Sequence, residues 1–110
     1  MNPKIVEKPW GYEEIWGDLP GKYLGKTLHI NMKNRLSLHK EKEETIYVIR
    51  GVLTLITKEY QENDNRMLNK ELIEVKQKLG PGNYFHIKPG VIHRFCAEKG
   101  DVVLAEVSTY

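Results

Sequence analysis

Residues 44–60, ETIYVIRGVLTLITKEY, contain two runs of β-branched and apolar residues, one on each side of Gly51. Runs of four to eight such residues are typical of β-strands, because branched side chains fit the pleated surface of a sheet. A glycine between two runs marks a turn, since it adopts backbone conformations that other residues avoid. The stretch therefore predicts two consecutive strands joined at Gly51.

Strand signals continue on both sides of this stretch, separated by glycine and proline. They recur at residues 22–32, 35–39, 72–79, 83–88, 91–97 and 101–110. Short strands at such regular spacing predict an all-β sandwich or barrel. We expect the polar residues 61–70 to form a hairpin loop, with a short helical turn near residues 67–72. The first six or so residues are expected to form a tail.

The bulk composition narrows the class of protein. A chain of 110 residues fits one domain of ordinary size. Its formal charge is +2, and acidic and basic residues are mixed along the chain, which argues against a nucleic-acid partner. Cys96 is the only cysteine, so an intrachain disulfide is excluded and a reducing compartment is favoured. We find no signal peptide and no run long enough to cross a membrane, so the prediction is a cytoplasmic protein without a membrane partner.

Histidines and carboxylates are the side chains that could carry chemistry. The four histidines are His29, His39, His86 and His93. His39 ends a predicted strand and begins an acidic run that includes Glu41 and Glu44. Neighbouring carboxylates repel one another unless a cation or basic groups neutralise them, although a charge run taken alone indicates a solvated turn. Imidazole and carboxylate groups brought together from separate strands could bind a divalent metal.

Two spaced motifs resemble those of the cupin superfamily. They cover residues of about 34–51 and 82–97, and they consist of His39, Glu44 and Gly51, followed by Gly82, Gly90 and His93. Within that superfamily, residues 7–14 (EKPWGYEE), 35–38 (RLSL) and 44–51 (ETIYVIRG) resemble the cupin domain of type II mannose-6-phosphate isomerases. The resemblance implies a single cupin domain over residues 1–110, folded as a double-stranded β-helix (a jelly-roll-like β-barrel). It also implies a homodimer with a metal inside each barrel.

The resemblance also implies a metal-ligand set. In the cupin pattern the first motif supplies two histidines, or a glutamine and a histidine, and then a glutamate, and the second motif supplies the last histidine. Glu44 and His93 match this pattern. The first pair does not, because the chain is about two residues short before Glu44, so either His39 and Glu41 or Ser37 and His39 take the first two places. The predicted ligands are His39, Glu41, Glu44 and His93, and they suit zinc, manganese, iron or nickel.

The implied activity is a metal-dependent isomerisation of a phosphorylated sugar between its aldose and ketose forms, as between mannose 6-phosphate and fructose 6-phosphate. Glu44, if it is not a ligand, or His86 could move the proton. Arg94, Lys88 and Arg35 are candidates for binding the phosphate, although Arg94 should point away from His93 because side chains alternate along a strand. Two alternatives stay open: a cupin that binds a small molecule or sugar without turnover, and another metal-dependent activity such as epimerisation or oxygenation.

Overall fold

The structure is a computed structural model that describes residues 1–31, 33, 35–39, 42–62 and 70–109. The side chains of these residues are described except those of 35–39, 59–62 and 70–72. Within this part of the chain no helix is long and apolar enough to cross a membrane.

All regular structure in the described residues is β-strand, which confirms the predicted all-β class. The strands are β1 (Lys4–Lys8), β2 (Gly11–Leu19), β3 (Tyr23–Ile30), β4 (Arg35–His39), β5 (Glu44–Arg50), β6 (Leu53–Glu62), β7 (Lys70–Leu79), β8 (Tyr84–Ile87), β9 (Ile92–Cys96) and β10 (Val102–Thr109).

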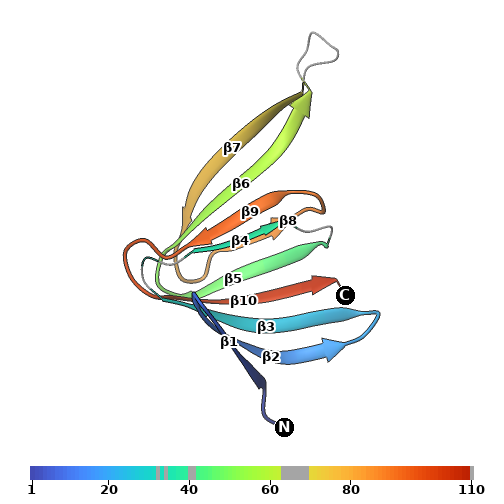
Figure 1. The fold of residues 1–110 in the computed structure, drawn as a ribbon, viewed down its shortest axis with the longest axis vertical. Coiled ribbons are helices and arrows are strands. Elements are labelled where there is room, and N and C mark those ends of the chain that lie inside the picture. Colours follow the sequence, from blue (N-terminus) through green and yellow to red (C-terminus); the bar gives the residue numbers. More distant parts are fainter. Residues whose placement is uncertain (32, 34, 40–41, 63–69, 110) are drawn as a thin grey trace.

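The strands form two antiparallel sheets that face each other (Figure 1). The six-stranded sheet has the order β1-β2-β3-β10-β5-β8, and the four-stranded sheet has the order β4-β9-β6-β7. One face of each sheet carries the apolar core, whose fully buried members include Leu28, Ile46, Leu55, Phe95 and Leu104. This arrangement is the predicted two-layer β-barrel.

Gly51 is the point at which the chain leaves one sheet for the other. The strand before it, β5, belongs to the six-stranded sheet, and β6 after it belongs to the four-stranded sheet. The φ angle of Gly51 is +86°, and a Cβ atom on it would lie 2.3 Å from the backbone oxygen of Asp101. Only glycine meets both conditions without strain, so the turn predicted at Gly51 is present for a steric reason.

Two expectations about irregular segments were wrong. The first residues do not form a tail, because Lys4–Lys8 pair with β2 along its first half, from Lys4 opposite Ile15 to Lys8 opposite Gly11. Of the hairpin loop expected over residues 61–70, residues 61, 62 and 70 are strand, since β6 continues to Glu62 and β7 begins at Lys70, and residues 63–69 lie outside the described residues. Of the helical turn expected near residues 67–72, residues 70–72 are strand and 67–69 lie outside the described residues.

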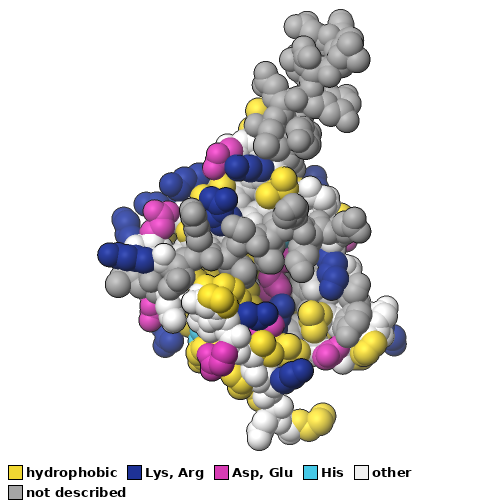
Figure 2. All heavy atoms as spheres, in the orientation of Figure 1, with side chains coloured by type: hydrophobic (Ala, Val, Ile, Leu, Met, Phe, Trp, Pro, Cys, Tyr) yellow, Lys and Arg dark blue, Asp and Glu magenta, His cyan; other side chains and the backbone are white. Residues whose placement is uncertain are grey.

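The surface carries both signs of charge, as the composition indicated. Lysine and arginine side chains are interspersed with aspartate and glutamate side chains on the face shown in Figure 2. Mixed charge of this kind favours solubility and provides no concentrated basic stripe on that face.

Candidate functional site

A row of polar side chains crosses the otherwise apolar interior of the barrel. We call it the interior polar row, and its members are Glu13, Lys26, Glu106, Glu44 and His93. The exposed fractions of Glu13, Glu44, Glu106 and His93 are 8%, 3%, 4% and 1%. Charged groups are rarely buried to this extent unless they are paired or bind a ligand.

Strand register explains why Lys26, Glu106 and Glu44 of the six-stranded sheet lie near one another. On β10, Glu106 stands opposite Lys26 of β3. Glu44 of β5 stands opposite Ser108, which is two residues beyond Glu106 on the same face. Residues on one face of adjacent strands are within reach when they are opposite or diagonal, so Lys26, Glu106 and Glu44 form a diagonal line across the sheet.

His93 reaches the same place from the facing sheet. Its Nε2 atom lies 3.7 Å from Oε2 of Glu44, and both side chains are almost fully buried. Its Nδ1 atom lies 3.2 Å from the carbonyl oxygen of Val91, to which the Nδ1–H group donates. A histidine that uses Nδ1 in this way presents a lone pair on Nε2, which is how metal-binding histidines are held.

Lys26 is held between two carboxylates at the other end of the row. Its Nζ atom lies 3.3 Å from Oε2 of Glu13 and 3.8 Å from Oε1 of Glu106. The row thus contains three carboxyl groups and one ammonium group. Its acidic groups outnumber its permanent cation, which makes the interior favourable for a further positive charge.

Glu106 shows the consequence of this imbalance. Its pKa is raised to about 7, chiefly because burial disfavours the charged form, and next because of the charge of Glu44. Lys26 acts in the opposite direction, and a hydrogen bond with the Glu44 side chain again favours the protonated form. Within the described part of the chain, the Oε2 atoms of Glu44 and Glu106 have no hydrogen-bond partner.

The His93–Glu44 pair fits a metal ion. Two ligands that each lie about 2.1 Å from one ion in tetrahedral geometry are about 3.4 Å apart, and the observed separation is 3.7 Å. Among the described residues, no group of three or more His, Cys, Asp or Glu side chains is arranged to hold a metal on its own. Further ligands would come from residues outside that part, from water or from a substrate.

The other two predicted ligands cannot be placed in this way. The side chain of His39 and the whole of residue 41 lie outside the described residues. The backbone register of β4 places Leu38 opposite His93, and His39 opposite Ile92. The roles of His39 and Glu41 therefore stay predictions, as does the alternative with Ser37 at the first ligand place.

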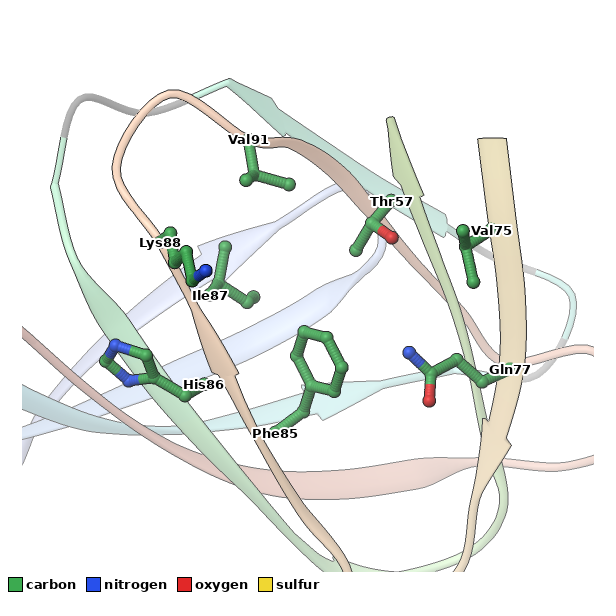
Figure 3. A pocket seen from close by; sticks show the side chains of 8 residues that line it. All are labelled: Thr57, Val75, Gln77, Phe85, His86, Ile87, Lys88 and Val91. Carbon is green, nitrogen blue, oxygen red and sulfur yellow. The ribbon is translucent and has the colours of Figure 1, made fainter. Parts of the chain in front are cut away.

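A pocket of about 260 Å³ is lined by residues of β6, β7 and β8 and of the turn that follows β8 (Figure 3). Its lining residues are Thr57, Val75, Gln77, Phe85, His86, Ile87, Lys88 and Val91. Ile87 stands opposite Glu44 and Thr57 stands opposite His93 in their sheets. The pocket therefore borders the interior polar row, with an apolar wall and a few polar groups, as small-molecule sites commonly have.

His86 lies at the rim of this pocket. In Figure 3 its ring points away from Phe85, and its Nε2 atom lies 2.7 Å from Oε2 of Glu43. Its Nδ1 atom is 3.0 Å from the hydroxyl oxygen of Thr45. The ring also borders a second hollow, of about 230 Å³, which Glu44 and Ser108 help to line. The structure thus places the predicted catalytic His86 near Glu44 but outside the interior polar row.

The predicted phosphate-binding residues are separated. Lys88 lines the pocket beside the His93–Glu44 pair. Arg94 stands opposite Ile56 and lines a different hollow, of about 40 Å³, with Ile56, Lys58, Ile92 and His93. It follows His93 directly in β9, so the two side chains leave opposite faces of that strand. Arg35 begins β4, and its side chain is outside the described set.

Sequence reasoning missed Glu13, Lys26 and Glu106. For Glu106 a signal was available: Val102, Leu104, Glu106 and Ser108 share one face of a predicted strand, and a glutamate on an apolar face needs an explanation. The residues that Glu106 contacts could be identified only once the strands that pair with β10 were known.

Comparisons with known proteins address the fold. No family profile and no curated protein sequence matches this chain. Among solved structures, it resembles KdgF from Halomonas sp., with 14% sequence identity, a TM-score of 0.72, and coverage of 96% of this chain and 86% of that chain. An RmlC-like cupin from Shewanella frigidimarina has 14% identity and a TM-score of 0.73, with 97% and 83% covered.

A third similar structure is much longer. The oxalate decarboxylase of Lactobacillus farciminis, solved as a formate complex, has 13% identity and a TM-score of 0.74. The match covers 97% of this chain and 30% of that chain, so this chain spans less than a third of the decarboxylase. Likeness at such low identity concerns the arrangement of the strands and not the activity. The fold of this chain is that of the cupins.

Proposed function

We propose that this chain is a metal-dependent cupin enzyme, and that it interconverts the aldose and ketose forms of a phosphorylated sugar. The observation that carries the metal dependence is the buried His93–Glu44 pair, with Nδ1 of His93 engaged by the carbonyl of Val91. The choice of isomerisation rests on the resemblance of residues 7–14, 35–38 and 44–51 to the cupin domain of type II mannose-6-phosphate isomerases.

His93 and Glu44 would hold the metal, with His39 and Glu41 as the further ligands that the sequence predicts. Zinc, manganese, iron and nickel all suit these donors. The metal, when bound, would polarise the carbonyl and hydroxyl oxygens of the substrate. Lys88 would bind the phosphate in the pocket, because it is the only lysine or arginine among the eight residues that line it.

The proton transfer of an aldose–ketose isomerisation requires a group that both accepts and donates. His86 is a candidate at the rim of the pocket, where Glu43 and Thr45 hold its ring. Glu44 could serve only if another residue replaced it as a ligand. Burial of the pair by apolar neighbours, such as Ile87 and Val91, would exclude bulk water from the reacting atoms.

The test is metal analysis of freshly purified protein, together with an assay that converts mannose 6-phosphate into fructose 6-phosphate. We expect close to one divalent ion per chain and measurable conversion. Protein that holds no metal and stays inactive after incubation with zinc, manganese, iron or nickel salts would overturn the proposal. Metal-bound protein that does not convert mannose 6-phosphate would support the proposed metal site and contradict the proposed substrate.

Binding without turnover is the second candidate. The observation that favours it is the lining of the pocket, since four of the lining residues are valine, isoleucine or phenylalanine and neither His93 nor Glu44 is among them. Calorimetric binding of a sugar phosphate with no conversion over hours would support this candidate. Epimerisation or oxygenation by a metal-loaded protein would be detected as a different product.

Three further properties remain proposals that follow from the sequence. The substrate would be the small-molecule partner, and neither nucleic acid nor membrane is expected as a partner. The protein would be cytoplasmic. It would also form a homodimer, which is consistent with the exposed aromatic and aliphatic side chains on the outer face of the six-stranded sheet, Trp16, Tyr47, Ile49 and Val107 among them.

A further inference from the structure

We propose that Glu106 is a positioning residue for the cation site. It acts by holding the carboxylate of Glu44 in place and by adding negative charge beside it. This inference rests on the proposed metal dependence and concerns residues that the cupin motifs do not include. Glu106 belongs to β10, outside both motifs, and no resemblance pointed to it.

The first support is the position of Glu106 between two partners. On one side its Oε1 atom lies 3.8 Å from Nζ of Lys26. On the other side it interacts with Glu44, which is diagonal to it across β10 and β5. Lys26 is itself held by Glu13 at 3.3 Å. A carboxylate fixed at one end in this way limits the rotation of the side chain beside it.

The second support is the pair of oxygen atoms that receive no hydrogen bond. Oε2 of Glu44 and Oε2 of Glu106 are buried, and neither has a partner among the described residues. Two buried carboxyl groups side by side are unfavourable unless a positive group compensates them. The ammonium of Lys26 faces Glu106 and Glu13, so it compensates Glu44 least. A divalent cation at Glu44 and His93 would supply the missing charge.

The third support is the order of the contacts, in which Glu44 lies between His93 and Glu106. Glu44 contacts His93 at its Oε2 atom, and Glu106 approaches Glu44 from the adjacent strand. Groups that contact a metal ligand from behind orient that ligand, and their loss typically lowers metal affinity by about 10-fold to 100-fold. Glu106 would act in this way through Glu44, without contacting the ion.

The experiment is a calorimetric titration of the metal-free protein with zinc, made on the wild type, Glu106→Gln and Glu14→Gln. Glutamine keeps the size of the side chain and removes its charge. Glu14 is the matched control, because it is a glutamate of the same sheet that lies on the outer face, where it pairs with His29, and it does not belong to the interior polar row. We expect Glu106→Gln to raise the dissociation constant at least 10-fold with unchanged stoichiometry. Glu14→Gln should stay within about 3-fold of the wild type.

A second measurement distinguishes an effect of Glu106 on metal binding from an effect on the stability of the fold. The thermal unfolding of each metal-free variant is recorded at pH 8, where we expect Glu106→Gln to be at least as stable as the wild type although its zinc affinity has fallen. If Glu106→Gln does not fold, Glu106→Asp replaces it, because aspartate keeps the charge but is shorter by one methylene group. We then expect the zinc affinity of Glu106→Asp to be lower than that of the wild type by more than 2-fold and less than 10-fold.

The outcomes distinguish this inference from the function on which it rests. Zinc binding by the wild type with equal affinity in Glu106→Gln, or in Glu106→Asp if that variant is used, would overturn the positioning role alone. An equal loss of affinity in Glu14→Gln and Glu106→Gln would also overturn it, because a diffuse charge effect would then suffice. A wild type that binds no divalent metal would overturn the proposed function and this inference together.

Discussion

The imidazole of His93 is oriented by the residue that precedes its strand. The carbonyl of Val91, just before β9, accepts the Nδ1–H group, and the other nitrogen is left facing Glu44. A backbone acceptor so close in sequence cannot move away without a change in the backbone where β9 begins. The orientation of the ring is therefore present before any ligand binds, which reduces the entropy lost on binding.

Replacement of His93 tests the cation site most directly. We expect His93→Ala to lose bound metal, with the metal content of the purified protein falling below a tenth of the wild-type value, because a primary nitrogen ligand is removed. The control is His29→Ala. His29 lies on the outer face of the six-stranded sheet, where its Nε2 atom pairs with Glu14 at 2.5 Å and its ring stacks on Tyr12. Metal content that is unchanged in His93→Ala would show that the ligand set is wrong.

Glu106 gives the metal-free protein a specific pH dependence. Its pKa is about 7 in the folded protein and 4.5 in the reference state, so the folded protein binds more protons than the unfolded chain between these values. The free energy of unfolding must then decrease as the pH rises from 4.5 to 7. The decrease is on the order of 3 kcal/mol. Urea unfolding with a chelator at pH 5 and pH 8 measures it, and Glu106→Gln should remove most of the difference.

The residues of the site differ in how far the sequence predicts them. His93 and Glu44 are predicted by the resemblance of their two motifs to those of the cupins. Glu106 is not, since a single glutamate in an apolar strand has no meaning until its neighbours are known. Its neighbours, Lys26 and Glu44, lie 80 and 62 positions away in the sequence.

At the scale of the elements, the turns are fixed by single glycines. Gly51 and Gly82 have nearly equal φ angles, +86° and +88°. A Cβ atom on Gly51 would meet the oxygen of Asp101 at 2.3 Å, whereas one on Gly82 would meet nothing within 4 Å. The two positions therefore share the conformational requirement and differ in the steric one.

This difference yields a matched pair of variants. We expect Gly82→Ala to lower the free energy of unfolding by about 1–2 kcal/mol, which is the cost of the left-handed conformation. Gly51→Ala should lower it by about 3 kcal/mol or more, because the turn must also move away from Asp101. Chemical denaturation of both variants checks the ranking. Equal losses would mean that the β5–β6 turn adapts without strain.

Strands were predicted more reliably than their ends. Apolar alternation identified β3 to β10 because a buried face imposes it on the residues. It missed β1, in which every residue except Val6 is exposed and no apolar face exists to be seen. It also missed β2, whose buried residues are two glycines and a glutamate, Gly11, Gly17 and Glu13. The pattern also predicted β6 and β7 to be shorter than they are, because the ends of this hairpin have polar residues and are held by strand pairing.

At the scale of the whole molecule, the sequence indicated two layers but not which strands are neighbours. Alternation specifies the face of a residue, and pairing depends on contacts between distant segments. The order β3-β10-β5 is an example, since β10 is the last strand in sequence and lies between two early ones. That order is what brings Lys26, Glu106 and Glu44 together.

The oligomeric state is a property of the whole molecule. We expect light scattering at micromolar concentration to give twice the mass of the chain, because aromatic and aliphatic side chains are exposed on the outer face of the six-stranded sheet. Tyr47 is 49% exposed there and Ile49 is 48% exposed. Ile49→Lys should then shift the mass toward a monomer, whereas Val52→Lys, in the turn after β5, should not. A wild-type protein of monomeric mass would contradict the prediction.

The central place of β10 also determines when the protein can fold as it is made. β3 and β5 share no partner until residues 102–109 have left the ribosome, because β10 pairs with both (Figure 1). Until then one edge of each strand carries unpaired backbone N–H and C=O groups, and nascent chains in this condition depend on chaperones to avoid association. Synthesis that stops before β10 should yield an aggregating fragment in place of a smaller barrel.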